Sequence, residues 1–141
     1  LVNSKFKDDH HKAIVNIRYT SNWLGNFYNN QLAEFGITLP QFNILRILRG
    51  AKQKLSIKVV KERMLEKSPN TTRLIDKLID KELVNRTRCN LDRRVVYIEI
   101  SDKGHVLLSK VDEVFDDISI RGNLTVQEAI VLSDLLDKIR S

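Results

Sequence analysis

The sequence has few of the residues that break regular structure or cross-link a chain. Its 141 residues include only two prolines, five glycines and one cysteine. Scarce proline and glycine argue against disorder. A lone cysteine, Cys89, cannot form an internal disulfide, which favours a reducing setting. Long apolar runs and a signal-peptide pattern are also absent. We therefore expect a folded cytoplasmic protein that does not enter a membrane.

Signatures of catalysis and of metal binding are missing as well. The sequence shows no nucleophile–base pair, no phosphate-binding glycine loop and no credible pair of carboxylates. His10 and His11 are adjacent and would point apart on a helix, and His105 completes no ligand spacing. We expect neither an enzyme nor a bound metal or cofactor.

The basic charge is concentrated in the middle of the chain. The net charge is +6, but the segment from Arg46 to Arg94 holds fifteen Lys/Arg and six Asp/Glu, and the remainder holds nine and twelve. A basic middle between mildly acidic ends is typical of a segment that meets phosphates, because each neutralised phosphate releases counterions. The charge pattern therefore favours a nucleic-acid partner.

Apolar periodicity predicts mostly helices. Residues from about 9 to 34 form one long helix that stops near Gly36, and a second helix starts at Leu39–Pro40 and ends at Gly50. Ser56 caps a third, short helix, and Ser68 with Pro69 starts a fourth. The fourth helix has an apolar stripe (Thr71, Leu74, Ile75, Leu78, Ile79) and a polar, basic face (Asn70, Thr72, Arg73, Asp76, Lys77, Lys81). Two short helices with a tight turn indicate a helix-turn-helix.

A hairpin follows the fourth helix. Residues from Leu83 to Cys89 and from Val95 to Ile100 alternate as strands, and the turn between them carries Asp92, Arg93 and Arg94. A polar hairpin tip can be explained by solvation alone. After a helix-turn-helix, however, the hairpin is the wing of a winged helix. The fold class is therefore mostly α with a small β-hairpin.

Two more amphipathic helices complete the chain. Ser101 and Asp102 cap the first of them, and Thr125 with Glu128 forms a capping box at the start of the second. Their apolar residues are Leu107, Leu108, Val111, Val114, Phe115 and Ile118, then Ile130, Leu132, Leu135, Leu136 and Ile139.

The stretch from Thr71 to Gly104, TTRLIDKLIDKELVNRTRCNLDRRVVYIEISDKG, resembles the MarR family of bacterial transcriptional regulators. The matching motifs are the recognition helix Thr72 to Leu78, Arg86 on the first strand, Asp92 with Arg94 in the wing, and the helix start from Ile100 to Gly104. One departure is Glu82, where the family usually has glycine in a left-handed turn that costs other residues about 1 kcal/mol.

The resemblance implies a homodimer that binds a pseudo-palindromic operator in double-stranded DNA. Residues 1–141 would form a single MarR-type domain, with a winged-helix lobe over about 38–104 and dimerisation helices over about 9–35 and 102–141. The implied function is transcriptional regulation by a repressor that a small-molecule effector releases. The alternative is a winged-helix module for protein interaction without a DNA role, against which the basic face of the fourth helix argues.

The expected DNA contacts are made by eight residues of the recognition helix and the wing. They are Ser68, Asn70, Thr72, Arg73, Lys77, Asp92, Arg93 and Arg94. Asn70 and Thr72 suit base edges. Arg73 suits guanine or a phosphate, and Lys77 suits a phosphate.

In the wing, the family motif points to Arg94 as the arginine that enters a minor groove, where A·T-rich tracts concentrate negative potential. Arg93 would meet a phosphate or solvent. Asp92 would accept a charge-assisted hydrogen bond from a nearby arginine, for which Arg94 is a candidate.

Two further features admit two interpretations each. Tyr19, Trp23 and Phe27 suit packing in the core or a dimer interface, but the resemblance also implies a pocket there for a small aromatic or phenolic effector. Cys89 lies near arginines that could lower its pKa. An inert strand cysteine is the favoured interpretation.

Overall fold

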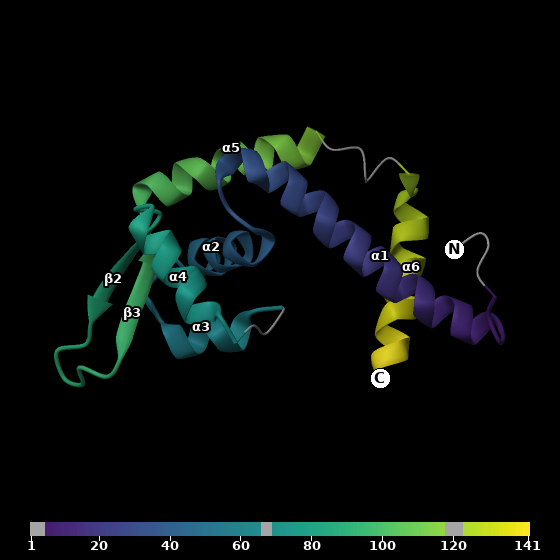
Figure 1. The fold of residues 1–141 in the computed structure, drawn as a ribbon, viewed down its shortest axis with the longest axis horizontal. Helices are drawn as coiled ribbons and strands as arrows, with labels where there is room; N and C mark the ends of the chain where they lie inside the picture. Colours follow the sequence, from purple (N-terminus) through teal and green to yellow (C-terminus); the bar gives the residue numbers. More distant parts are fainter. Residues whose placement is uncertain (1–4, 66–68, 118–122) are drawn as a thin grey trace. The chain divides into compact units, whose positions relative to one another are not determined.

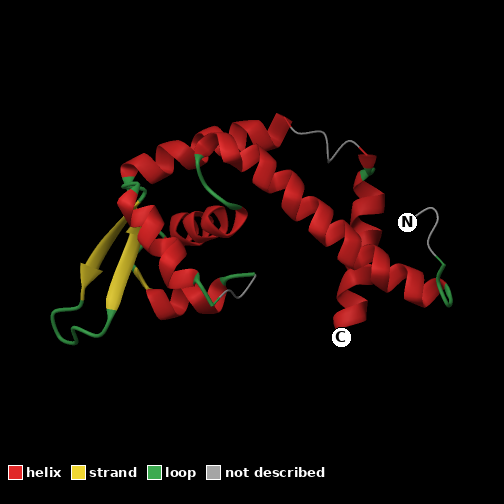
Figure 2. Ribbon diagram, in the orientation of Figure 1, coloured by secondary structure: helices red, strands yellow, loops and turns green. Residues whose placement is uncertain are grey.

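The computed structural model describes residues 5–65, 69–117 and 123–141. The chain divides into two compact units, residues 1–108 and 109–141. Helices dominate the described residues, and the three strands form one small sheet (Figures 1 and 2). The expected mostly helical fold with a small hairpin is confirmed.

The N-terminal unit begins with the long helix α1, Asp9–Leu32, and a 3-10 turn, η1, Ala33–Phe35. Asp8 caps α1, since its carboxylate accepts a hydrogen bond from the His11 amide at 2.8 Å. Gly36 follows η1 with φ of 70°, a left-handed conformation that glycine adopts without steric cost. The predicted helix and its stop are therefore confirmed.

Helix α2, Leu39–Ala51, begins with a capping box that was not predicted. The Thr38 hydroxyl accepts from the Gln41 amide at 3.4 Å, and the Gln41 side chain accepts from the Thr38 amide at 3.0 Å. The helix ends at Ala51 and not at Gly50, because the left-handed residue that terminates it is Lys52, with φ of 54°.

The helix-turn-helix consists of α3, Ile57–Arg63, and α4, Thr71–Asp80. Ser56 caps α3 as predicted and accepts from the Val59 amide at 3.2 Å. The predicted start of α4 at Pro69 is wrong, because Pro69 and Asn70 form a turn and Asn70 occupies the N-cap position with non-helical angles. The other part of that prediction, Ser68, lies outside the described residues.

The sheet has the order β1-β3-β2, with β1 at Leu55–Ser56, β2 at Val84–Arg88 and β3 at Val96–Ile100. Both pairings are antiparallel, so the predicted hairpin is confirmed with slightly shorter strands. The third strand, β1, was not expected: Leu55 pairs with Ile98 in the central strand. Ile98 is fully buried, which places β3 against the core.

The core of the N-terminal unit is built around α2, which packs against α1, α3, α4 and β3. Most of its fully buried side chains are aliphatic, and those that come from these five elements are Leu32, Ile44, Leu45, Leu48, Val60, Ile75, Leu78 and Ile98. The side-chain amide of Gln41 also donates to the Leu74 carbonyl at 3.4 Å. Helix α4 is therefore fixed to the unit by its inner face.

Helix α5, Asp102–Asp117, begins at a close contact with the end of α4. Ser101 caps it as predicted, because its hydroxyl accepts from the Gly104 amide at 3.0 Å and donates to the Glu82 carbonyl at 2.6 Å. A Cβ on Gly104 would lie within 3.0 Å of Leu83 and Ile100, so only glycine fits this approach without a shift.

In the C-terminal unit, α6 spans Val126–Arg140. The predicted capping box is confirmed, since the Thr125 amide donates to the Glu128 carboxylate at 2.9 Å and the Thr125 hydroxyl accepts in return at 3.1 Å. Along the described parts of the chain, no helix is both long and apolar enough to cross a bilayer.

Candidate nucleic-acid interface

Helix α4 presents a polar face to solvent. Thr71, Ile75 and Leu78 are buried, and the buried Thr71 hydroxyl donates to the Met64 sulfur at 3.6 Å. The opposite face exposes Thr72, Arg73, Asp76 and Lys77. The amphipathic pattern therefore leaves the predicted contact residues of this helix open to a ligand, while the buried residues hold its orientation.

The C-terminal end of α4 is held by backbone and side-chain contacts. The Glu82 and Leu83 amides donate to the Ile79 and Leu78 carbonyls at 2.9 and 3.0 Å. Glu82 adopts φ of 61°, so the left-handed turn expected for the family is present although the residue is not glycine. The Lys81 ammonium also donates to the Gly36 carbonyl, which joins the end of α4 to the turn before α2.

The turn between β2 and β3 projects away from the helices and forms the wing (Figure 1). Two backbone hydrogen bonds shape it: the Cys89 amide donates to the Val95 carbonyl and the Val95 amide donates to the Asp92 carbonyl, both at 3.0 Å. The backbone of the wing is therefore a hydrogen-bonded turn.

Asp92 and Arg94 form an ion pair at the tip of the wing. The Asp92 carboxylate accepts from the Arg94 amide at 3.0 Å, from Nε at 3.2 Å and from Nη2 at 3.4 Å. These hydrogen bonds, led by those from the guanidinium, lower the pKa of Asp92 below its ordinary value. The expectation that Asp92 accepts a hydrogen bond from a nearby arginine is confirmed, and the arginine is Arg94.

The ion pair does not cover the arginine. The Arg94 side chain remains 92% exposed, and Arg93 is exposed beside it. Leu91, immediately before Asp92, is 99% exposed. The tip of the wing therefore offers two guanidinium groups and one apolar side chain to whatever it contacts.

The structure adds basic candidates that the predicted site omitted. Arg86 and Arg88 are exposed on β2 and, two residues apart on a strand, share one face of the sheet. Lys54, just before β1, donates to the Thr87 hydroxyl at 3.4 Å. Arg88 could have been predicted beside Arg86, because residues two apart on a strand lie on the same face. The position of Lys54, in contrast, depends on strand β1, which was not predicted.

The predicted recognition-helix and wing residues belong to the same compact unit. Helix α4 packs against β2, the strand that leads into the wing. Seven of the eight predicted contact residues lie on α4, at its N-cap or in the turn between β2 and β3, and the eighth, Ser68, is not among the described residues. The arrangement suits a double helix, in which a helix can enter the major groove while a neighbouring arginine reaches the minor groove.

The aromatic residues predicted for an effector pocket lie on α1. Trp23 and Phe27 stack with ring centroids 5.7 Å apart, and Phe27 meets Tyr28 edge-on at 5.8 Å. Tyr19 and Trp23 are 57% and 49% exposed. The structure thus brings Trp23 and Phe27 together on a partly exposed surface.

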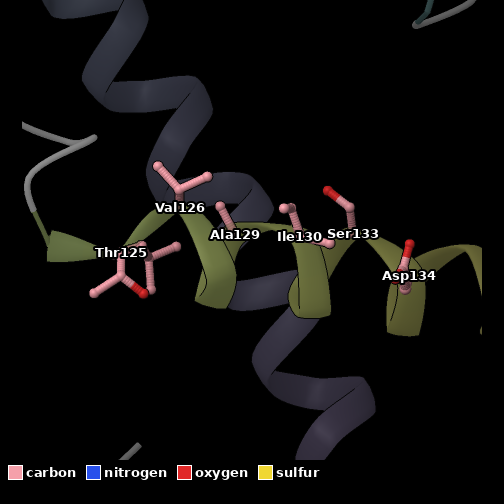
Figure 3. A pocket seen from close by; sticks show the side chains of 7 residues that line it. Thr125, Val126, Ala129, Ile130, Ser133 and Asp134 are labelled. Carbon is pink, nitrogen blue, oxygen red and sulfur yellow. The ribbon is translucent and has the colours of Figure 1, made fainter.

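The C-terminal unit contains an open, mostly apolar hollow at the start of α6 (Figure 3). Its lining residues are Leu124, Thr125, Val126, Ala129, Ile130, Ser133 and Asp134. Within the described residues, no group of three His, Cys, Asp or Glu side chains could hold a metal ion.

Comparison with solved structures identifies the same architecture. A mutant of MarR from E. coli complexed with operator DNA superimposes with a TM-score of 0.81 at 24% identity, over 96% of this chain and 99% of that one. The organohalide-sensing transcriptional regulator RdhR, in its 2,4-dichlorophenol-bound form, gives a TM-score of 0.84 at 17% identity, over 99% and 86%. The chain therefore has the MarR-type winged-helix fold.

Sequence comparison gives the family. Residues 26–111, more than half of the chain, match the family described as "Transcriptional regulator SarA/Rot". The HTH-type transcriptional regulator SarZ of Staphylococcus aureus (strain USA300) is 30% identical over 114 residues, 81% of this chain and 74% of SarZ. These matches are to transcriptional regulators and not to enzymes, as the sequence led us to expect. The chain belongs to the SarA/Rot family of transcriptional regulators, with the MarR-type winged helix as its fold.

Proposed function

We propose that this regulator binds a pseudo-palindromic operator in double-stranded DNA as a homodimer. The observation that carries the proposal is the pairing, within one compact unit, of the open polar face of α4 with a wing whose Arg94 is oriented by Asp92 yet 92% exposed. The structural similarity to a MarR protein complexed with operator DNA supports it. In this arrangement α4 is the recognition helix.

Side-chain chemistry assigns the roles on α4. Asn70 and Thr72 lie at the start of the helix, where the recognition helix of a helix-turn-helix contacts base edges. Arg73 contacts guanine or a phosphate, since its guanidinium fits both. Lys77, one turn further along, contacts a phosphate and so positions the helix without specifying sequence.

The wing reaches the neighbouring minor groove. Arg94 enters it, and Asp92 acts indirectly by orienting Arg94. Arg93 contacts a phosphate or remains in solvent. Ser68, which lies outside the described residues, stays a predicted DNA contact on the basis of its sequence position alone.

The homodimer is supported by apolar surface that the single chain leaves open. Along α6, Val126 is 80% exposed, and Ile130, Leu135 and Ile139 are each about half exposed. Apolar surfaces of this extent mark interfaces. We take residues 1–141 as one MarR-type domain, in which residues of about 38–104 bind DNA and the flanking helices, about 9–35 and 102–141, dimerise. Deleting residues 125–141 should then yield an aggregated or unfolded protein, and a soluble, folded monomer would contradict the dimer.

The regulator acts as a repressor that a small aromatic or phenolic effector releases. Support comes from the partly exposed pair Trp23 and Phe27 on α1 and from the structural similarity to RdhR in its 2,4-dichlorophenol-bound form. A mostly apolar surface with few polar groups, such as the one around Trp23 and Phe27, suits a small aromatic or phenolic molecule.

Selection of bound fragments from a random library of DNA duplexes by the purified full chain tests the DNA role. Enrichment of a shared palindromic site supports the proposal. An Arg73→Ala, Lys77→Ala, Arg94→Ala variant is the control, because it removes three exposed cations from the proposed interface. If the wild-type chain enriches no site, the fold serves instead as a protein-interaction module.

A further inference from the structure

Leu91 is the most exposed large apolar residue described in the chain. It lies at the tip of the wing, between Asn90 and Asp92, with 99% of its surface open to solvent. Single exposed apolar residues are common on protein surfaces and need no explanation of their own. Leu91, however, lies in a hydrogen-bonded turn beside two exposed arginines, and these neighbours indicate what kind of partner it meets.

The tip of the wing is a hydrogen-bonded turn, and Leu91 lies within it. The residue after it, Asp92, is bonded to the Arg94 amide and guanidinium and, through its carbonyl, to the Val95 amide. The strands on either side are paired up to Arg88 and Val96. The backbone that carries Leu91 therefore loses little further freedom when it meets a partner.

The charge at the tip points to DNA as that partner. Arg93 and Arg94 follow Leu91 closely and are both exposed, whereas an apolar pocket on another protein would gain little from two guanidinium groups beside it. In minor grooves, proteins combine arginines with apolar side chains, leucine among them, that insert between base pairs and unstack them. A leucine next to a groove-entering arginine has the right chemistry for this role.

Resting on the proposed operator binding, we propose that Leu91 is a wedge that inserts at a base step in the minor groove beside Arg94 and bends the operator there. The wedge makes binding depend on how easily the DNA deforms at the contacted base step. Pyrimidine–purine steps unstack at low cost and A-tracts are stiff, so the operator carries a flexible step at the contacted position. Leu91 thereby reads sequence without a hydrogen bond to a base.

Three measurements on the full chain and its selected operator test the wedge. First, hydroxyl-radical footprinting locates the minor-groove segment that the wing protects. Second, 2-aminopurine placed there should brighten when the wild-type chain binds, because unstacking relieves its quenching, and should not brighten with Leu91→Ala. Third, Leu91→Ala should bind about tenfold more weakly. Its salt dependence should be unchanged, because no charge is removed.

Two matched variants and one altered operator separate the wedge from other roles. Leu91→Met should retain brightening and affinity, because it keeps an apolar side chain of similar volume. Leu91→Lys should lose the brightening although it adds a cation. Replacing the flexible step by an A-tract should weaken the wild type relative to Leu91→Ala, because the stiff tract resists the wedge while it attracts Arg94 equally in both proteins, and this difference is the mark of coupling between the Leu91 side chain and that step.

The outcomes distinguish this inference from the proposed function. If the wild type binds the operator and Arg94→Ala weakens binding, while Leu91→Ala binds and brightens like the wild type, the wedge is refuted and operator binding stands. Tighter binding by Leu91→Lys would equally overturn the wedge in favour of simple charge attraction. If the wild type selects no DNA site, operator binding fails and the wedge fails with it.

Discussion

The carboxylate of Asp92 accepts hydrogen bonds from both Nε and Nη2 of Arg94, at 3.2 and 3.4 Å, and a third from the Arg94 amide at 3.0 Å. Both side chains are accessible to water, so the pair adds little to the stability of the fold. Its effect is on geometry. The aspartate restricts the rotamers of an exposed arginine before any ligand arrives, which reduces the ordering cost of binding.

The two wing arginines should differ in their contribution to operator binding. Arg94→Ala should cost roughly 1–3 kcal/mol of binding free energy, because it removes the oriented minor-groove contact. Arg93→Ala should cost less and mainly flatten the salt dependence, by up to about one unit in the slope of log K against log salt. Fluorescence anisotropy titrations of both variants on one operator across a salt series measure both quantities.

Neither substitution should unfold the protein, because both side chains are exposed. Unchanged thermal melting of the free variants is the control. If Arg93→Ala proves the more damaging variant, the assignment within the wing is reversed. If neither matters, the polar tip reflects solvation alone.

Protonation of Asp92 should release Arg94. The pKa of Asp92 is lowered from its ordinary value of 3.8, first by the Arg94 guanidinium and then by the Arg94 amide. A carboxyl group whose folded-state pKa is depressed contributes its interaction above the unfolded value and loses it as pH falls through the folded value. The ion pair should therefore be intact at neutral pH and break only below the usual range of an aspartate.

NMR titration of the Asp92 carboxyl carbon, with the Arg94 Nε–H resonance followed in parallel, measures this transition. Asp92→Asn keeps the shape of the side chain without its charge, so it should show a freed Arg94 at neutral pH and weaker operator binding. A midpoint at or above that of an aspartate in a short unstructured peptide would contradict the ion pair.

The local part of this fold could be predicted because its signals are local. Ser56, Ser101 and Thr125 each accept a hydrogen bond from an amide three residues ahead, and such caps can be read directly from the sequence. The Thr38–Gln41 box has the same signature and could have been found. At Pro69 the local signal misled, because a Ser-Pro start is only a tendency and Thr71 begins the helix instead.

The nonlocal part could not be read in this way. Strand β1 is two residues long and exists through its pairing with β3, which lies more than forty residues further along the chain. The contact from Lys81 to Gly36 spans 45 positions. On the candidate site, the family motif pointed to the Asp92–Arg94 pair, but the exposure of Leu91 depends on how the turn folds and had no signature of its own.

Glu82→Gly should stabilise the protein by up to about 1 kcal/mol. Glu82 holds a left-handed conformation, φ 61°, that costs a residue with a Cβ about this much and costs glycine nothing. Urea unfolding at a fixed protein concentration measures the change. Glu82→Ala is the matched control, because it removes the carboxylate and its exposed 3.9 Å contact with Lys103 but keeps the Cβ.

The control should leave the free energy of unfolding nearly unchanged, since an exposed ion pair contributes little. If both variants raised the free energy of unfolding equally, the carboxylate of Glu82, and not its left-handed backbone conformation, would be what destabilises the wild type.

Binding of an effector near Trp23 should be coupled to DNA binding. Trp23 is the only tryptophan, is 49% exposed and stacks on Phe27, so its fluorescence reports directly on this surface. We expect a small aromatic acid such as salicylate to quench it and to weaken operator binding over the same concentration range. Linkage requires the reverse effect as well: saturating operator DNA should weaken salicylate binding by the same factor.

Phe27→Ala is the informative variant, because it removes the stacking partner of Trp23 and keeps Trp23 itself as the fluorescent reporter. It should reduce the quenching and the loss of DNA affinity together. Quenching that leaves DNA affinity unchanged would mean that the aromatic surface binds salicylate incidentally and that Trp23 and Phe27 serve packing alone.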